Sequence, residues 1–367
     1  MHKYCLLIII LLSTFLHAQD VEVKVHGDST KHFRIKPVNW DTVQYRKYNY
    51  VFIVGYFSQY RVFNNEIISQ MHKDTLGLGK QTYVAQSGVV NGLVFNYDKF
   101  QIAIGGRPKF KDTSSTKGRT QMFNIGVSFG DNRYVSESYY RRFTGFYNSN
   151  RNVLDSLDHA KGKYYLEPNM RSSLFMTRIM YFTRYRGFSY KSGFGCNYRQ
   201  LKSAFTWIYG ANYSTYTMLN DSSVIPDKAH FMFNEYSRMR GLRSYNLGVT
   251  LGAAGTLVLF KAWFINGSFT FGPEQQWRDY DLISGHRRIS YISGSGTGRF
   301  SAGLNMKKFY MLVSITNDYN LYNSSAIMKF KSEAISHNFT FGWRFHSGEP
   351  PQFYKRFQQT KFYKLFG

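Results

Sequence analysis

The chain has 367 residues and a formal net charge of +25, because 47 lysines and arginines stand against 22 aspartates and glutamates. Aromatic residues make up 19% of the chain, with 33 Phe and 30 Tyr, yet the mean hydropathy is −0.38. No apolar run after the N-terminal segment approaches the roughly 20 residues of a spanning helix, which excludes a helical membrane protein. In an exported protein this charge predicts anionic partners such as lipopolysaccharide phosphates, acidic glycans or an acidic protein surface. No nucleic-acid motif accompanies it, so we predict no nucleic-acid partner.

The N-terminus has the pattern of a secretory signal peptide. A Met-His-Lys start precedes an apolar run from Cys5 to Leu16, and Ala18 offers a small residue for cleavage. A membrane anchor is the alternative, but the run is too short to span a bilayer. We predict a signal peptide at residues 1–18, which leaves Cys196 as the one cysteine of the mature chain. No intrachain disulfide is then possible, and we expect Cys196 to be an inert strand residue.

Residues 19–48 are polar and irregular, and we predict a periplasmic lead-in there. From 49 to 346 the chain repeats segments in which apolar residues alternate with polar or small ones, the period of a strand with two different faces. The clearest run has an apolar or small residue at every second position: Leu247, Val249, Leu251, Ala253, Gly255, Leu257 and Leu259.

About 12 strands are predicted in chain order. They lie near 49–62, 93–97, 100–104, 123–129, 133–147, 188–198, 205–213, 247–259, 263–271, 291–305, 309–315 and 336–345. Long loops are expected at 148–187, 217–243 and 275–290. Within the first of these, residues 171–187 fit a helix, a loop or an extra strand.

Tight turns are predicted at 98–99, 130–132, 199–202, 260–262 and 306–308, all on the side opposite the long loops. Outer-membrane barrels have an even number of strands, short periplasmic turns and longer outer loops. The pattern therefore predicts an all-β fold, a transmembrane antiparallel β-barrel over residues 49–346 in the outer membrane of a Gram-negative bacterium. Loops 148–187 and 217–243 would lie outside the cell. A soluble β-sandwich is the alternative, but it explains neither the outward aromatics nor the loop asymmetry.

Residues 347–367 follow the last predicted strand as a basic, aromatic periplasmic tail. We predict that it engages an envelope protein partner, while the barrel itself contacts outer-membrane lipids and lipopolysaccharide. The candidate binding residues of the tail are Phe353, Tyr354, Lys355, Arg356 and Phe357.

Charged residues on the polar registers of the strands are the candidates for the lumen: Arg142, Arg299, Arg344 and Asp318. Twelve strands enclose a space that side chains can largely fill, so these groups either plug the barrel or line a narrow anion-preferring pore. No His-Glu-x-x-His or Cys-x-x-Cys motif occurs, and no metal or cofactor is predicted.

An outer-membrane lipid hydrolase is a more distant alternative. Such a site needs a His and a Ser on one strand face, whereas the adjacent His346 and Ser347 would point to opposite faces. His286 and Ser290 lie in the predicted loop at 275–290. We therefore predict a non-enzymatic barrel that binds or scaffolds, with a narrow channel for small anionic solutes as the alternative.

The stretch Phe-Thr-Arg-Tyr-Arg-Gly-Phe-Ser-Tyr at 182–190, followed by Tyr-Arg-Gln-Leu-Lys-Ser-Ala at 198–204, resembles domain of unknown function 4421, a family of exported Bacteroidota proteins. Members typically have an aromatic-Ser strand entry and then a Gln-Lys-Ser-Ala-like turn. The order of segments is similar over most of the mature chain. The resemblance implies an outer-membrane location and brings no activity.

Overall fold

The structure is a computed structural model. It describes residues 43–48, 51–70, 74, 76–107, 116–150, 164–260, 262–320, 328–346, 349–360 and 363–364. The chain divides into two compact units, Met1–Pro37 and Val38–Gly367. The predicted signal peptide at 1–18 and most of the predicted lead-in at 19–48 lie outside the described residues.

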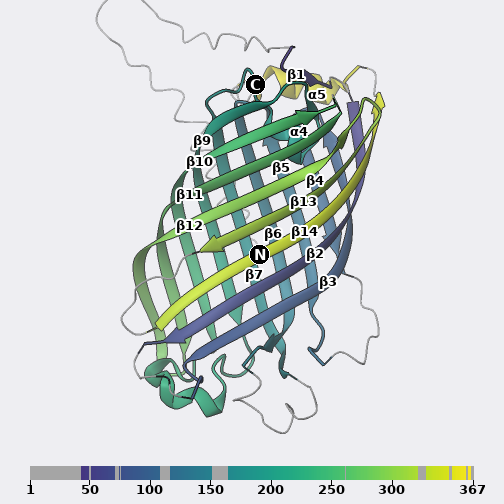
Figure 1. Ribbon diagram of the computed structural model, residues 1–367. Coiled ribbons are helices and arrows are strands. Elements are labelled where there is room, and N and C mark those ends of the chain that lie inside the picture. Colours follow the sequence, from purple (N-terminus) through teal and green to yellow (C-terminus); the bar gives the residue numbers. More distant parts are fainter. Residues whose placement is uncertain are drawn as a thin grey trace, which may run out of the picture. The chain divides into compact units, whose positions relative to one another are not determined.

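Twelve strands of the second unit close into an antiparallel barrel in the order β10-β11-β12-β13-β14-β2-β3-β4-β5-β6-β7-β9 (Figure 1). The wall strands are β2 (Val51–Ser69), β3 (Lys80–Tyr97), β4 (Phe100–Gly106), β5 (Gln121–Gly130), β6 (Tyr134–Asn148), β7 (Tyr165–Phe182), β9 (Ala204–Leu219), β10 (Gly241–Leu259), β11 (Trp263–Leu282), β12 (Gly285–Asn305), β13 (Phe309–Asn320) and β14 (Met328–His346). Two short strands, β1 (Tyr45–Lys47) and β8 (Tyr198–Gln200), form a separate two-stranded sheet that is not part of the barrel wall.

The alternation of residue types determines which side chains face the lumen. In β2, Ile53, Phe57 and Arg61 are buried, while the intervening Phe52 and Tyr56 are exposed. The same holds around the ring, so the outer surface carries an apolar belt with many aromatic side chains. Because a closed sheet has no unpaired edge and presents apolar residues outward, this wall has the construction of a transmembrane barrel.

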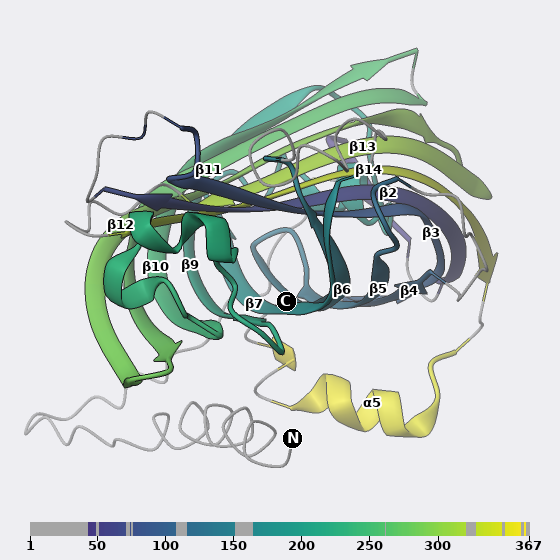
Figure 2. The ribbon, with the colours of Figure 1, turned by 90° about the horizontal axis from the view of Figure 1, so that it is seen from below.

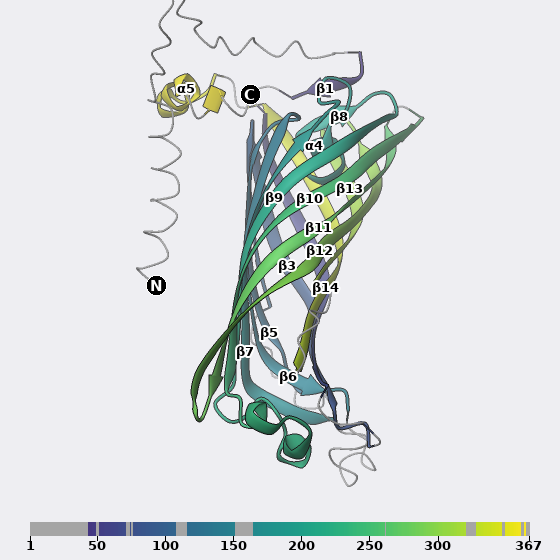
Figure 3. The same cartoon turned by 90° about the vertical axis from the view of Figure 1, so that its left-hand side faces the viewer.

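The two ends of the barrel differ (Figures 1 and 3). At one end, called here the turn end, lie hairpin turns such as 98–99 and 306–308, the start of β2 and the end of β14. The α-helices α4 (Tyr190–Phe194) and α5 (Gln352–Gln359) lie at this end. The opposite, loop end carries the two 3-10 helices η1 (Asp227–Met232) and η2 (Asn234–Tyr236), seen over one side of the ring in Figure 2.

The predicted number of strands is confirmed, but one strand is in the wrong place. Residues 188–198 do not form a wall strand, because Gly193, Gly195 and Cys196, which has a φ of 55°, interrupt the extended backbone. The twelfth strand is β7, inside the segment predicted as a loop at 148–187. Its residues 171–182 settle the choice among helix, loop and extra strand in favour of the strand.

A second prediction is also wrong: 275–290 is not a loop. There β11 and β12 continue as one hairpin to the pair Leu282 and Gly285. Most outward residues of this stretch are polar, which resembles a loop, but they alternate with inward residues as in a strand. Among the described residues, no helix has the length and apolar character needed to cross a membrane.

Candidate functional site

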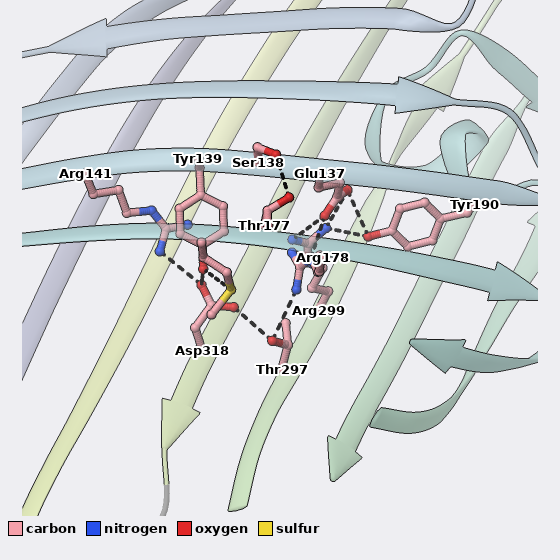
Figure 4. Close-up of polar contacts among 11 residues, drawn as sticks. Glu137, Ser138, Tyr139, Arg141, Thr177, Arg178, Tyr190, Thr297, Arg299 and Asp318 are labelled. Atoms are coloured by element: carbon pink, nitrogen blue, oxygen red, sulfur yellow. Dashed lines mark hydrogen bonds and ion pairs between the residues drawn. The ribbon is translucent and has the colours of Figure 1, made fainter. Parts of the chain in front are cut away.

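A network of charged and hydroxyl side chains crosses the lumen from β6 and β7 to the opposite strands β12 and β13 (Figure 4). Each member that lies on a wall strand occupies an inward register position of that strand. The members are Glu137, Tyr139, Arg141, Arg178, Thr297, Arg299 and Asp318 from the wall, together with Tyr190 from α4.

Glu137 is the centre of one half of this network. Its Oε2 lies 2.8 Å from Nε of Arg178 and 3.0 Å from Nη2 of Arg299. The Tyr190 hydroxyl donates to its Oε1 at 3.3 Å. One carboxylate therefore joins β6, β7, β12 and α4.

Asp318 is the centre of the other half. Its Oδ2 accepts a hydrogen bond from Nη1 of Arg141 at 3.0 Å, and its Oδ1 accepts one from the Thr297 hydroxyl at 3.0 Å. Arg178 Nη1 donates to the same hydroxyl at 3.2 Å, which links the two halves. Because side chains from opposite walls of the barrel contact each other here, they fill the middle of the lumen.

The predicted lumen charges divide into three inward residues and one outward residue. Asp318 and Arg299 belong to the central network, and Arg344 lies buried near the turn end. Arg142 is exposed on the outer face of β6, and its neighbour Arg141 is the inward arginine. The prediction for Arg142 was one residue out of register, which moves a strand residue to the other face.

Residues 183–203, called here the plug segment, fold into the turn end of the barrel and carry α4 and β8. Asn305 Nδ2 of β12 donates to the carbonyls of Ser192 at 3.2 Å and Tyr198 at 2.9 Å. Asn96 Nδ2 of β3 donates to the Gly195 carbonyl at 2.9 Å. The plug segment contains all but the first and last residues of the stretches that resemble the family pattern, so most of that pattern forms an inward insertion between β7 and β9.

Arg344 binds the backbone of the plug segment between α4 and β8. Its Nη2 donates to the Cys196 carbonyl at 2.5 Å and to Asn305 Oδ1 at 2.7 Å. Cys196 is fully buried, and burial raises the pKa of its thiol to about 12, with the nearby Arg344 opposing the shift. The thiol is therefore protonated at neutral pH. Cys196 lies in the plug segment and not, as predicted, in a wall strand.

Lys191 is the buried cation of the plug segment. Its Nζ donates to the Lys99 carbonyl at 2.7 Å. Burial lowers the pKa of Lys191 to about 8, although the carboxylates of Asp131 and Asp98 oppose the shift. The plug segment thus holds an ammonium group whose charged form is disfavoured by its surroundings.

At the loop end, residues 220–240 cover the lumen with apolar side chains. Val224, Met232 and Tyr236 are buried together with the wall residues Phe63 and Phe143. The hydroxyls of Tyr83 and Ser69 donate to backbone carbonyls of this segment, at Val224 and Met232. The lumen therefore changes from polar in its middle to apolar toward the loop end.

The C-terminal tail contacts the barrel at Asp98, in the turn between β3 and β4. The Tyr354 hydroxyl donates to Asp98 Oδ2 at 3.0 Å, the Tyr363 hydroxyl donates to the same oxygen, and Lys47 Nζ of β1 lies 3.0 Å from Oδ1. Burial alone would raise the pKa of Asp98, but Lys47 and the two tyrosine hydroxyls lower it below its ordinary value.

The five tail residues predicted to bind a partner therefore differ in their availability. Tyr354 is buried, and the Phe357 ring lies 6.1 Å from the Phe129 ring of the wall. Phe353 and Arg356 are exposed, and Lys355 Nζ lies 2.6 Å from Glu349 Oε2.

Other candidate chemistry finds separate partners. His286 Nδ1 lies 3.8 Å from Asp281 Oδ1, whereas the Ser290 hydroxyl accepts a hydrogen bond from Gln275 at 2.6 Å. Within the described part of the chain, no group of three or more His, Cys, Asp or Glu residues is placed to hold a metal ion.

The sequence analysis did not identify several residues of the network and plug segment, among them Glu137, Arg178, Tyr190 and Lys191. Glu137 and Arg178 share a signal that could have identified them, since both alternate with outward residues and they face each other across β6 and β7. Tyr190 and Lys191 had no such signal, because the residues around them were interpreted as a wall strand.

Solved outer-membrane barrels resemble the chain only distantly. The outer membrane protease OmpT from Escherichia coli is 8% identical, with 84% of this chain and 99% of that chain covered and a TM-score of 0.38. An outer membrane channel from Pseudomonas putida F1 is 10% identical, with 84% and 100% covered and a TM-score of 0.32. The toluene transporter TodX of P. putida is 8% identical, with 80% and 90% covered and a TM-score of 0.27. With TM-scores below 0.5, these likenesses do not bear on the function of this chain.

No curated protein matches the chain. A family model described as a domain of unknown function does match, and it spans residues 40–345, from before the first wall strand to the end of the last. This match confirms the resemblance identified from residues 182–190 and 198–204. The chain belongs to the family DUF4421.

Proposed function

We propose that the protein is an outer-membrane barrel with a closed lumen, which binds or scaffolds in the cell envelope and neither conducts solutes nor catalyses a reaction. The observation that carries this proposal is the plug segment, residues 183–203, which is hydrogen-bonded to β3, β12 and β14. The central charge network and the apolar cover at 220–240 support it, since each fills a different level of the same lumen.

The membrane placement is supported by the outer surface. Exposed Phe52, Leu251 and Phe341 are typical of its apolar belt, which would be costly to leave in water. Short turns of such barrels face the periplasm, so the turn end, the plug segment and the C-terminal tail are periplasmic and the loop end is extracellular.

Planar-bilayer conductance tests the closed lumen. The wild-type protein should show no steady open state, because the plug segment, the network and the cover each place side chains across a different level of the lumen. A variant in which residues 184–202 and 221–239 are both replaced by short Gly-Ser linkers, and which also carries Glu137→Ala and Asp318→Ala to break the central network, should conduct. Its current should prefer anions, because Arg61, Arg141, Arg178 and Arg299 then face the middle of the lumen without the carboxylates of Glu137 and Asp318.

Heat-modifiable migration on gels shows whether both proteins are folded, and Lys202→Gln, at an exposed position of the plug segment, is the matched control. A steady pore in the wild-type protein would contradict the proposal and favour a narrow channel for small anions. Release of fatty acid from phospholipid vesicles by the folded protein would instead favour an enzyme.

The exposed face of α5 is the part of the tail that we assign to an envelope protein partner. Phe353 and Arg356 are exposed, whereas Tyr354 of the same helix contacts Asp98. Phe353→Ala with Arg356→Gln should abolish partner recovery in a pull-down from native membranes, while the exposed control Gln359→Ala should not. Equal recovery by both variants would exclude the tail as the binding surface.

A further inference from the structure

We infer that a basic pocket on the outer face of the barrel, at its loop end, binds the phosphate group of an anionic lipid headgroup in the outer leaflet. The pocket has a volume of about 160 Å³. Its lining includes Gly88, Arg107, Lys117, Arg119, Thr120 and Tyr147. The inference rests on the proposed membrane placement and names a ligand class for it.

The pocket arises from unequal strand lengths. Because β4 and β5 end early, β3 pairs directly with β6 beyond them, at Tyr83 with Asn148 and Val84 with Tyr147. The residue after β4, Arg107, and the residue before β5, Thr120, line the pocket beside this pairing. A notch in the outer face of the wall results.

The absence of a side chain at Gly88 leaves room for the guanidinium of Arg107 at the notch. Gly88 has a φ of +62°, and a Cβ at this position would lie 3.0 Å from Nη1 of Arg107. The pairing of β2 with β3 shifts register next to it, between Tyr60 and Val62. The guanidinium of Arg107 therefore packs over the backbone of β3, where a side chain would otherwise stand.

The described lining residues carry three positive charges and no carboxylate. Lys117 is exposed, and its Nζ lies 5.6 Å from the ring centroids of both Tyr147 and Tyr164. Guanidinium groups pair with phosphate oxygens through two parallel hydrogen bonds, and an ammonium adds a point charge. The chemistry of the pocket therefore fits a phosphate monoester or diester.

The position of the pocket selects a lipid as the source of that phosphate. The last exposed apolar residues before it are Val89 on β3, Ile104 on β4 and Phe123 on β5. Each lies within three residues of a lining residue, so the pocket begins where the apolar belt ends. This is the level of lipid headgroups.

Two further cations extend the pocket along the outer wall. Arg142 is exposed opposite Phe123, and Arg171 is exposed opposite Thr144 on the adjoining strand. Long basic side chains at the border of the apolar belt reach toward headgroups. Arg142, which contributes nothing to the lumen, thus belongs to a basic surface on the lipid side.

Calorimetric titration of the full-length folded protein tests the inference, with diphosphoryl lipid A in neutral-detergent mixed micelles as the probe. Lys117→Gln with Arg119→Gln should weaken binding about 25-fold, from about fivefold for each basic residue removed near a membrane surface. The charge-matched control is Arg243→Gln with Arg288→Gln, two exposed arginines at the loop end of other wall strands. The control should bind within about twofold of wild type.

Equal binding by the pocket variant, or an equal loss in the control variant, would overturn the inference. Inorganic phosphate, titrated alone, should show no saturable binding, and competition by free phosphate would exclude the lipid as the source. Heat-modifiable migration confirms that each variant is folded. A wild-type pore in bilayers would contradict the closed lumen but leave this pocket intact, so the two proposals fail separately.

Discussion

Single residues decide how the lumen is filled, and β6 shows why sequence alone places them with difficulty. The run Tyr139-Tyr140-Arg141-Arg142 has the same residue types in both registers. The alternation of residue types therefore does not show which arginine faces the lumen. Phe143 also misleads, because it faces an apolar part of the lumen and not lipid. The lumen is apolar at one level and charged at another. Assigning all polar strand residues to the lumen and all apolar ones to the lipid side is therefore wrong for part of this barrel.

Loss of the Glu137 carboxylate should be costly. In Glu137→Gln, Arg178 and Arg299 keep their charges without the carboxylate that now lies 2.8 and 3.0 Å away. We expect the free energy of unfolding, measured in urea with detergent-folded protein, to fall by about 3 kcal/mol. Arg142→Gln, on the outer face of the same strand, should change it by less than about 0.5 kcal/mol. Similar small changes in both variants would show that the network contributes little.

Lys191 should make stability depend on pH. Its pKa in the folded protein is lowered to about 8, from an ordinary 10.5, so the unfolded chain binds more protons between these values. Stability should therefore rise as the pH is raised from about 8 to about 10. Lys191→Met should lose part of this rise, as followed by urea unfolding at each pH. An unchanged slope in the variant would exclude Lys191 as its source.

Among the elements, the plug segment is the one that strand periodicity could not foresee. Tyr190, Phe194 and Tyr198 have the spacing of aromatic residues on a strand, yet the first two belong to α4 and the third to β8. What ends the strand pattern is the backbone at Gly195 and Cys196 and the hydrogen bonds to Asn96 and Asn305, which come from distant parts of the sequence. Such long-range partners leave no local signal.

The docked tail gives a prediction about an element. Tyr354→Phe with Tyr363→Phe removes both hydroxyls from Asp98, at about 1 kcal/mol each. Trypsin cleavage after Lys355 or Arg356 should then become about 30-fold faster, since each 1.4 kcal/mol of docking energy is a factor of ten. Phe353→Ala, which removes an exposed ring from the same helix, should leave the rate unchanged. Cleavage as slow as in wild type would show that these hydroxyls do not hold the tail.

At the scale of the whole barrel, the sequence predicted the architecture well. The closed ring, the number of strands and the hairpin turns at 98–99 and 306–308 follow from local alternation and turn residues. The count is correct partly because two errors cancel, a strand wrongly placed at 188–198 and β7 left unassigned. Closure of an antiparallel ring restricts the predicted number of strands, because only an even number returns the chain to the side where it began.

The same even count gives a prediction for orientation. Ser222 lies exposed at the loop end and Lys307 lies exposed in a hairpin turn at the turn end. In whole cells, Ser222→Cys should react with a membrane-impermeant maleimide and Lys307→Cys should not. Wild-type protein is the control, since its Cys196 is fully buried. The reverse labelling pattern would invert the topology and place the basic pocket on the periplasmic side.

The pairing of β2 with β14 runs along all 19 residues of β2 and joins the first wall strand to the last. In hydrocarbon, peptide groups without a hydrogen-bonding partner are too costly for an open sheet edge. The first strand therefore has no stable place in the membrane until Met328–His346 have been exported beside it. Biogenesis must keep the chain waiting in a form competent for insertion, and a polypeptide cut short before β14 has two open edges that can pair only with other chains.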